Sequence, residues 1–172
     1  MKILSKQRNS RMCMICGLDN EYGVNAPFYN MEDSSVMTVF RYKEQHQSYP
    51  GRVHGGMITA MLDEMGLRSL WAKELSEETF GVTISLDTKY RKPVPYETEL
   101  IGRGVVVKNT SHFIITDSYI MDKDGEVLAN GRIKYIKMDT QKIQEGVEVH
   151  EEMPYLVEDG RTEIEGPFFD NL

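Results

Sequence analysis

One long apolar segment that opens on a pair of glycines limits the folds open to this chain. Residues 53–67 read Val-His-Gly-Gly-Met-Ile-Thr-Ala-Met-Leu-Asp-Glu-Met-Gly-Leu. The pattern predicts a helix from about Gly55 to Glu74 whose apolar side chains nearly encircle it. A helix of this kind is buried in the centre of a domain. Other elements of the chain must therefore surround it.

Strand-like segments flank this helix on both sides. Val82, Ile84 and Leu86 alternate with polar residues, which predicts a strand with these three side chains on the core face. Short turns such as Asp124-Gly125 separate the later segments, so we expect antiparallel pairing. The predicted strands are 36–42, one around 82–87, 100–107, 112–121 and 127–138. The order β-α-β-β-β-β predicts an α+β fold in which an antiparallel sheet wraps around one long central helix.

The predicted organisation is an N-terminal extension (1–30), one domain (31–138) and an acidic C-terminal tail (139–172). Glycines and Pro27 interrupt the extension, which we expect to be irregular, with a short basic helix at its start. The tail holds 10 acidic and 2 basic residues, a net charge of −8, so the total of −7 leaves about +1 for the rest. We expect this tail to be peripheral and partly helical or mobile.

Charge and hydropathy exclude several classes of protein. A net charge of −7 argues against nonspecific nucleic-acid binding. No segment approaches the ~20 apolar residues of a membrane span, and the first residues do not resemble a signal peptide. We therefore expect a cytoplasmic protein that binds neither nucleic acid nor membrane.

Cys13 and Cys16 form a single C-x-x-C motif. Such a pair is typical of half a zinc site or of a redox centre. The four histidines show no ligand spacing, and no βαβ pattern surrounds the pair. These observations favour reduced, structural cysteines and predict no metal site.

Two adjacent acids, Asp63 and Glu64, lie within the apolar helix. A carboxylate among Met, Ile and Leu side chains is costly unless it is paired or used. The glycine-started helix N-terminus offers backbone N–H groups that can polarise a carbonyl oxygen. Together these features predict hydrolysis of a carbonyl compound.

The motif Tyr49-Pro-Gly-Arg-Val-His-Gly-Gly56 followed by Leu62-Asp-Glu64, with the predicted order of elements, resembles the hotdog-fold acyl-CoA thioesterases of the PaaI-like type. The resemblance continues through Tyr90-Arg-Lys-Pro-Val94 and Gly131-Arg132, and it includes the early C-x-x-C-Gly segment. It covers roughly residues 10–138. It implies release of a carboxylic acid and CoA from an acyl-CoA, without a metal or a separate cofactor.

The resemblance also implies roles for individual residues. Asp63 is the general base or the nucleophile, the alternative being an ion pair with a residue such as Arg68. Gly55 donates its N–H to the thioester oxygen. Glu64 lies about 100° around the helix, which favours a supporting or interface position and leaves it as the alternative base. For His54, support of the loop is favoured over contact with substrate.

Ser48 departs from the pattern of the related enzymes, whereas Thr83 matches it. Those enzymes often carry an amide side chain six residues before the histidine, where this chain has Ser48, next to Gln47. Thr83 matches a position that orients the attacking water in some relatives, although strand alternation directs it away from the predicted core face. If Thr83 lay at a dimer interface, its outward direction would be compatible with a role in orienting the water.

Coenzyme A carries phosphates, so the resemblance predicts basic residues near the cleft. Arg91 and Lys92, with Gly56 at the start of the predicted helix, are the candidate CoA-binding residues. The acyl chain is not predicted. The alternative function is a hotdog-fold protein that binds acyl-CoA without hydrolysing it, which the Ser48 departure favours.

Helix geometry adds an inference about assembly. Gly55 and Asp63 are eight residues apart, so about 12 Å separates them along one helix. Groups that act on one carbonyl must both lie within about 3 Å of it. The sequence therefore predicts a homodimer with shared active sites, or a homotetramer built from such dimers.

Overall fold

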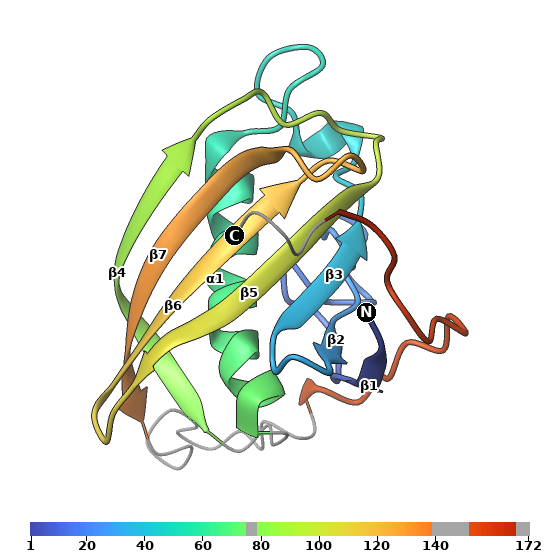
Figure 1. Ribbon diagram of the computed structural model, residues 1–172. Helices are drawn as coiled ribbons and strands as arrows, with labels where there is room; N and C mark the ends of the chain where they lie inside the picture. The colour runs from blue at the N-terminus through green and yellow to red at the C-terminus, as the bar shows by residue number, and fades with distance from the viewer. Residues whose placement is uncertain (75–78, 139–151, 168–172) are drawn as a thin grey trace.

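Seven antiparallel strands curve around a single long helix in the computed structural model (Figure 1), which describes residues 1–74, 79–138 and 152–167. The helix α1 (Gly55–Glu74) lies in the concave face of the sheet, and a short 3-10 helix, η1 (Glu44–His46), precedes it. The strands follow the order β1-β2-β3-β5-β6-β7-β4 across the sheet. Their bounds are β1 (Ile3–Lys6), β2 (Tyr29–Met31), β3 (Val36–Phe40), β4 (Phe80–Tyr90), β5 (Leu100–Asn109), β6 (Phe113–Met121) and β7 (Val127–Met138). The predicted α+β fold is confirmed, with β1 and β2 as additions.

Close contact between α1 and the sheet depends on glycine in β5. Met61, Leu62 and Met65 are fully buried on the helix. A Cβ at Gly104 would lie 2.5 Å from the backbone oxygen of Met65, and a Cβ at Gly102 would lie 2.4 Å from the sulfur of Met65. The bare backbone of β5 therefore allows the helix to lie directly on the strand.

The predicted face of β4 is wrong for part of the strand. Val82 and Ile84 are 43% and 50% exposed, whereas Thr83 points to the helix. The pairing of β4 with β7 is irregular between Thr83 and Ser85, where Ile84 has no partner. This bulge shifts the alternation by one residue. As a result Leu86 lies on the core side as predicted, while Val82 and Ile84 do not.

The N-terminal residues are part of the fold. No helix forms in residues 1–30, and Ile3–Lys6 is instead the strand β1, which pairs with β2. Ile15, Cys16 and Phe28 are buried in the same apolar cluster as Met61 and Met65. The N-terminal segment therefore closes one side of the core around α1.

Residues 153–167 of the C-terminal tail form isolated β-bridges at Tyr155 and Glu163, have no helix, and lie against the N-terminal segment. The N–H of Ile3 donates to the carbonyl of Thr162 at 2.9 Å, and Asn9 pairs with Tyr155. Ile164 is buried with residues of β1, β2 and β3. The prediction for residues 139–151 and 168–172 lies outside the described residues. Within the described chain, α1 and η1 lack the combination of length and apolar character that a membrane-crossing helix needs.

Candidate active site

The carboxylate of Asp63 meets the edge strand of the sheet. Asp63 lies in the middle of α1, and its Oδ1 accepts a hydrogen bond from Thr83 Oγ1 at 2.8 Å. The two residues come together because the bulge in β4 turns Thr83 towards the helix. A half-buried carboxylate is thereby placed at the open edge of the sheet, with a hydroxyl group to orient it.

Burial raises the pKa of Asp63 above its ordinary value, and the negative charge of Glu64 adds to this rise. Hydrogen bonds from Thr83 and Tyr135 lower the pKa and offset part of it. A carboxylate with a raised pKa is a stronger base once it is ionised. The environment of Asp63 therefore suits proton abstraction.

Tyr135 in β7 supports this part of the helix and was not among the residues singled out from the sequence. Its hydroxyl donates to the backbone carbonyl of Asp63 at 2.7 Å. A Cβ at Gly66 would lie 2.1 Å from this hydroxyl, so glycine at position 66 lets Tyr135 reach the helix. The sequence signal that could have found it is strand alternation, which directs Tyr135 to the face of the strand that packs on the helix.

Glu64 points away from Asp63 and pairs with Arg68. Glu64 Oε1 lies 2.7 Å from Arg68 Nε, and Arg68 is 1% exposed. Arg68 also donates to Gln7 Oε1 and to the backbone oxygen of Arg8, both at 3.1 Å. Thus Glu64, not Asp63, is the acid that neutralises the buried arginine, and Asp63 has no ion pair among the described residues.

His54 caps the N-terminus of α1. Its Nδ1 accepts the N–H of Gly56 at 2.9 Å, and its carbonyl accepts the N–H groups of Met57 and Ile58. Within the described residues, no acceptor takes the N–H of Gly55. The structure therefore gives His54 the loop-supporting position that the sequence favoured and leaves one backbone donor, at Gly55, unengaged.

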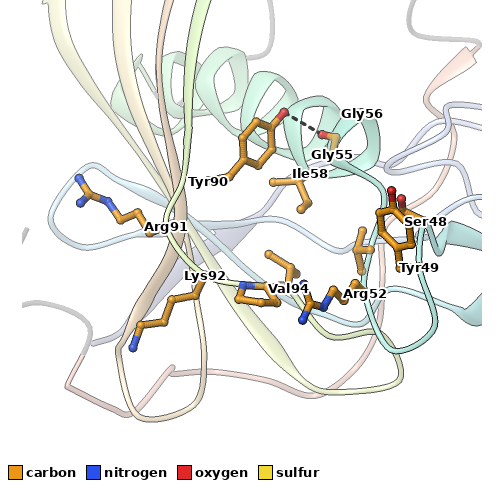
Figure 2. A pocket seen from close by; sticks show the side chains of 12 residues that line it. Ser48, Tyr49, Arg52, Gly55, Gly56, Ile58, Tyr90, Arg91, Lys92 and Val94 are labelled. Carbon is orange, nitrogen blue, oxygen red and sulfur yellow. Dashed lines mark hydrogen bonds between the residues drawn. The ribbon is translucent and has the colours of Figure 1, made fainter.

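This helix N-terminus opens into a pocket of about 530 Å³. Figure 2 shows the Tyr90 side chain at its wall, with the hydroxyl donating to the carbonyl of Gly55 at 3.2 Å. Five residues predicted from the sequence line this pocket: Ser48, Gly55, Gly56, Arg91 and Lys92. Gln47 does not line it, so of the two candidate replacements for the missing amide only Ser48 is at the pocket.

The charged side chains of the pocket wall are all basic. Arg52 joins Arg91 and Lys92, and none of the described lining residues is acidic. The backbone N–H groups of Arg91 and Lys92 both donate to the carbonyl of Leu128, which holds this segment against the start of β7. Arg52 was missed in the sequence because it follows a Pro-Gly turn and has no neighbouring basic residue.

The structure therefore separates the predicted site residues into two groups along one helix, called here the two half-sites. Gly55, Gly56 and the basic side chains gather at the N-terminus of α1, whereas Asp63 and Thr83 lie two turns further along. Neither Asp63 nor Thr83 lines the pocket. Within one chain, Gly55 lines this pocket and the Asp63 carboxylate does not.

Comparisons with known proteins agree with the fold and with the motif. Residues 50–129 match the family model described as the thioesterase superfamily. Acyl-coenzyme A thioesterase THEM4 of Rattus norvegicus is 25% identical over 140 residues, covering 81% of this chain and 57% of the relative. The Mus musculus protein of the same name is 27% identical over 128 residues, covering 73% of this chain and 52% of the relative. The chain thus spans about half the length of the curated relatives it matches.

Solved structures show the same architecture. A thioesterase superfamily protein is similar with a TM-score of 0.65 and 26% identity, over 73% of this chain and 63% of that one. A thioesterase protein of Streptococcus pneumoniae, solved with coenzyme A, is similar with a TM-score of 0.57 and 19% identity, over 67% of this chain and 87% of that one. The sheet wrapped around α1 is the hotdog fold. Residues 50–129, the part that matches the thioesterase superfamily model, contribute the helix α1 and the strands β4 to β6 of this fold.

Proposed function

We propose that this protein hydrolyses the thioester of an acyl-CoA to a carboxylic acid and CoA. The observation that carries the proposal is the half-buried Asp63 carboxylate, hydrogen-bonded by Thr83 and free of any ion pair among the described residues. Relatives named as acyl-CoA thioesterases support the choice of substrate. Coenzyme A enters as part of the substrate.

In the proposed reaction, the Gly55 N–H stabilises the negative charge that develops on the thioester oxygen. Asp63 either takes a proton from the attacking water or attacks the carbonyl carbon itself, and Thr83 orients the carboxylate for both. The CoA thiolate is the leaving group. Arg52, Arg91 and Lys92 supply positive charge for the phosphates of CoA.

The two half-sites complete each other only across a dimer. The edge strand β4 supports this assembly because it exposes Val82 and Ile84 next to Thr83. Exposed β-branched side chains on a long edge strand are a ready site for pairing with a second chain. With a second copy against β4, Asp63 of one chain is directed at the pocket of the other, and two equivalent sites result.

The experiment that tests the proposal is thiol release from short, long and aromatic acyl-CoAs by the whole protein. Turnover of at least one of these substrates supports the thioesterase. Saturable binding of acyl-CoA without turnover would contradict it and would favour a binding protein instead. Ser48, which replaces the amide of related enzymes, would then be the residue to examine.

The pH dependence provides a prediction for Thr83. Because the Thr83 hydroxyl lowers the pKa of Asp63, we expect Thr83→Val to raise that pKa further. The acid limb of the kcat/KM profile, which follows ionisation of the free enzyme, should move to higher pH. Thr83→Ser keeps the hydroxyl and should leave the limb in place. A limb that stays unmoved in Thr83→Val would show that this hydrogen bond does not tune the base.

A further inference from the structure

The C-x-x-C segment forms a tight turn that only glycine can close. The N–H of Gly17 donates to the carbonyl of Cys13 at 2.9 Å, and a Cβ at Gly17 would lie 2.5 Å from the backbone nitrogen of Cys13. At the start of the turn, the N–H of Cys13 donates to Ser10 Oγ at 3.1 Å. Both thiols are free, and Cys13 and Cys16 are the chain's two cysteines.

The turn is anchored in the core. Asn9, fully buried, donates to the carbonyl of Cys16 at 2.7 Å and to that of Ala26 at 2.9 Å. The N–H of Ala26 donates to the carbonyl of Ile15 at 2.9 Å. These contacts fix the backbone of the turn and therefore limit how far the two thiols can move relative to each other.

The two thiols have different surroundings. Cys13 is partly exposed, and its Sγ accepts the N–H groups of Ile15 at 3.3 Å and of Cys16 at 3.5 Å. Cys16 is 2% exposed. The hydrogen bond from the Cys16 thiol lowers the pKa of Cys13 to about 6, and the same bond, together with burial, raises the pKa of Cys16. The accessible thiol is therefore the one that ionises.

Glu64 and Arg68 of α1 are the charged groups that face the pair. The sulfurs of Cys13 and Cys16 and a Glu64 carboxylate oxygen lie within 4.8 Å of one another. Glu64 raises the pKa of both thiols, and Arg68 lowers that of Cys16. Three such atoms also suit a divalent cation, but Glu64 already neutralises the buried guanidinium of Arg68. A divalent cation bound to this cluster would also lie next to the buried positive charge of Arg68, which disfavours metal binding.

We propose that Cys13 and Cys16 form a redox-active dithiol that exchanges with small-molecule disulfides. The Cys13 thiolate attacks one sulfur of the disulfide, and the first small thiolate leaves. Cys16 loses its proton to solvent and attacks the Cys13 sulfur of the mixed disulfide, releasing the second small thiolate. Two protein thiols are oxidised to one disulfide, and one disulfide is reduced to two thiols.

The test is treatment of the whole protein with glutathione disulfide, followed by intact mass and free-thiol measurement. The wild type should lose two hydrogen atoms and retain no glutathione. Cys16→Ser should retain one glutathione on Cys13, and Cys13→Ser should react roughly tenfold or more slowly, because Cys16 is buried and protonated. In urea, which removes the turn, the two single variants should react at equal rates.

Three results would overturn the proposal. Equal rates for the two folded single variants would show that the turn does not activate Cys13. A mixed disulfide that persists in the wild type would show that Cys16 does not resolve it. Stoichiometric zinc that protects both thiols in the purified protein would identify the cluster as a metal centre.

Discussion

Replacing Asp63 by Asn is expected to lower kcat for acyl-CoA hydrolysis by about 100-fold or more, the usual contribution of a positioned general base. The amide keeps the size of the side chain and can still accept the hydrogen bond from Thr83, but it can neither take a proton nor attack a carbonyl. The measurement is thiol release at saturating substrate. Asp124→Asn makes the same chemical change at an exposed position in the turn between β6 and β7 and should leave kcat within about twofold of the wild type.

Stability separates a catalytic loss from a folding loss in this variant. Because burial raises the pKa of Asp63 in the folded state, its protonated form favours folding, and this contribution is lost as the pH rises through the folded-state pKa. An amide does not ionise, so Asp63→Asn should be at least as stable as the wild type at neutral pH. A variant that loses activity and also unfolds at lower denaturant concentration would contradict the catalytic assignment.

Gly104→Ala is expected to destabilise the protein strongly, by roughly 3 kcal/mol or more in the free energy of unfolding. The new methyl group would lie 2.5 Å from the backbone oxygen of Met65 and 3.0 Å from a methyl carbon of Val36. A backbone oxygen within a buried helix cannot turn aside, so α1 must shift from the sheet. Chemical denaturation measures the loss.

Gly131→Ala is the matched control for this change. Gly131 is buried in β7, and a Cβ there would have its nearest contacts at 3.5 Å, an ordinary van der Waals distance. We expect a change within about 1 kcal/mol. Equal destabilisation by the two substitutions would show that close approach of α1 to β5 is not what requires glycine at position 104.

The long helix and the long strands were predictable because their hydropathy patterns extend over many residues. The bounds of α1, Gly55–Glu74, and of β7, Val127–Met138, match the predicted segments. Strands of three or four residues, such as β1 and β2, are too short for alternation to reveal. They form because long-range pairing with other strands and with the C-terminal tail supplies their hydrogen bonds.

Parts of the site depended on irregularities that the sequence does not display. The bulge at Ile84 reverses which residues of β4 face the helix, and it places Thr83 on Asp63. Strict alternation therefore predicted the wrong direction for Val82 and Ile84. Arg52 joins the pocket because the loop before α1 folds back against the segment that follows β4, a long-range contact with no local signal.

The residues of the helix itself were easier to assign. Helical geometry predicted that Asp63 and Glu64 point in different directions, and the structure places one on Thr83 and the other on Arg68. The same geometry predicted that Gly55 and Asp63 cannot meet within one chain. The shared active site thus follows from the spacing of two residues on one helix and stands as the central prediction.

Mixing two inactive variants tests this shared site most directly. Asp63→Asn removes the carboxylate, and Gly55→Pro removes the N–H donor at the first helical position, where helices accept proline. Neither variant should turn over acyl-CoA alone. After unfolding and refolding together, half of the dimers should be mixed, each with one intact site, and about a quarter of the wild-type activity should return. Mixed dimers that form but stay inactive would contradict an active site built from two chains.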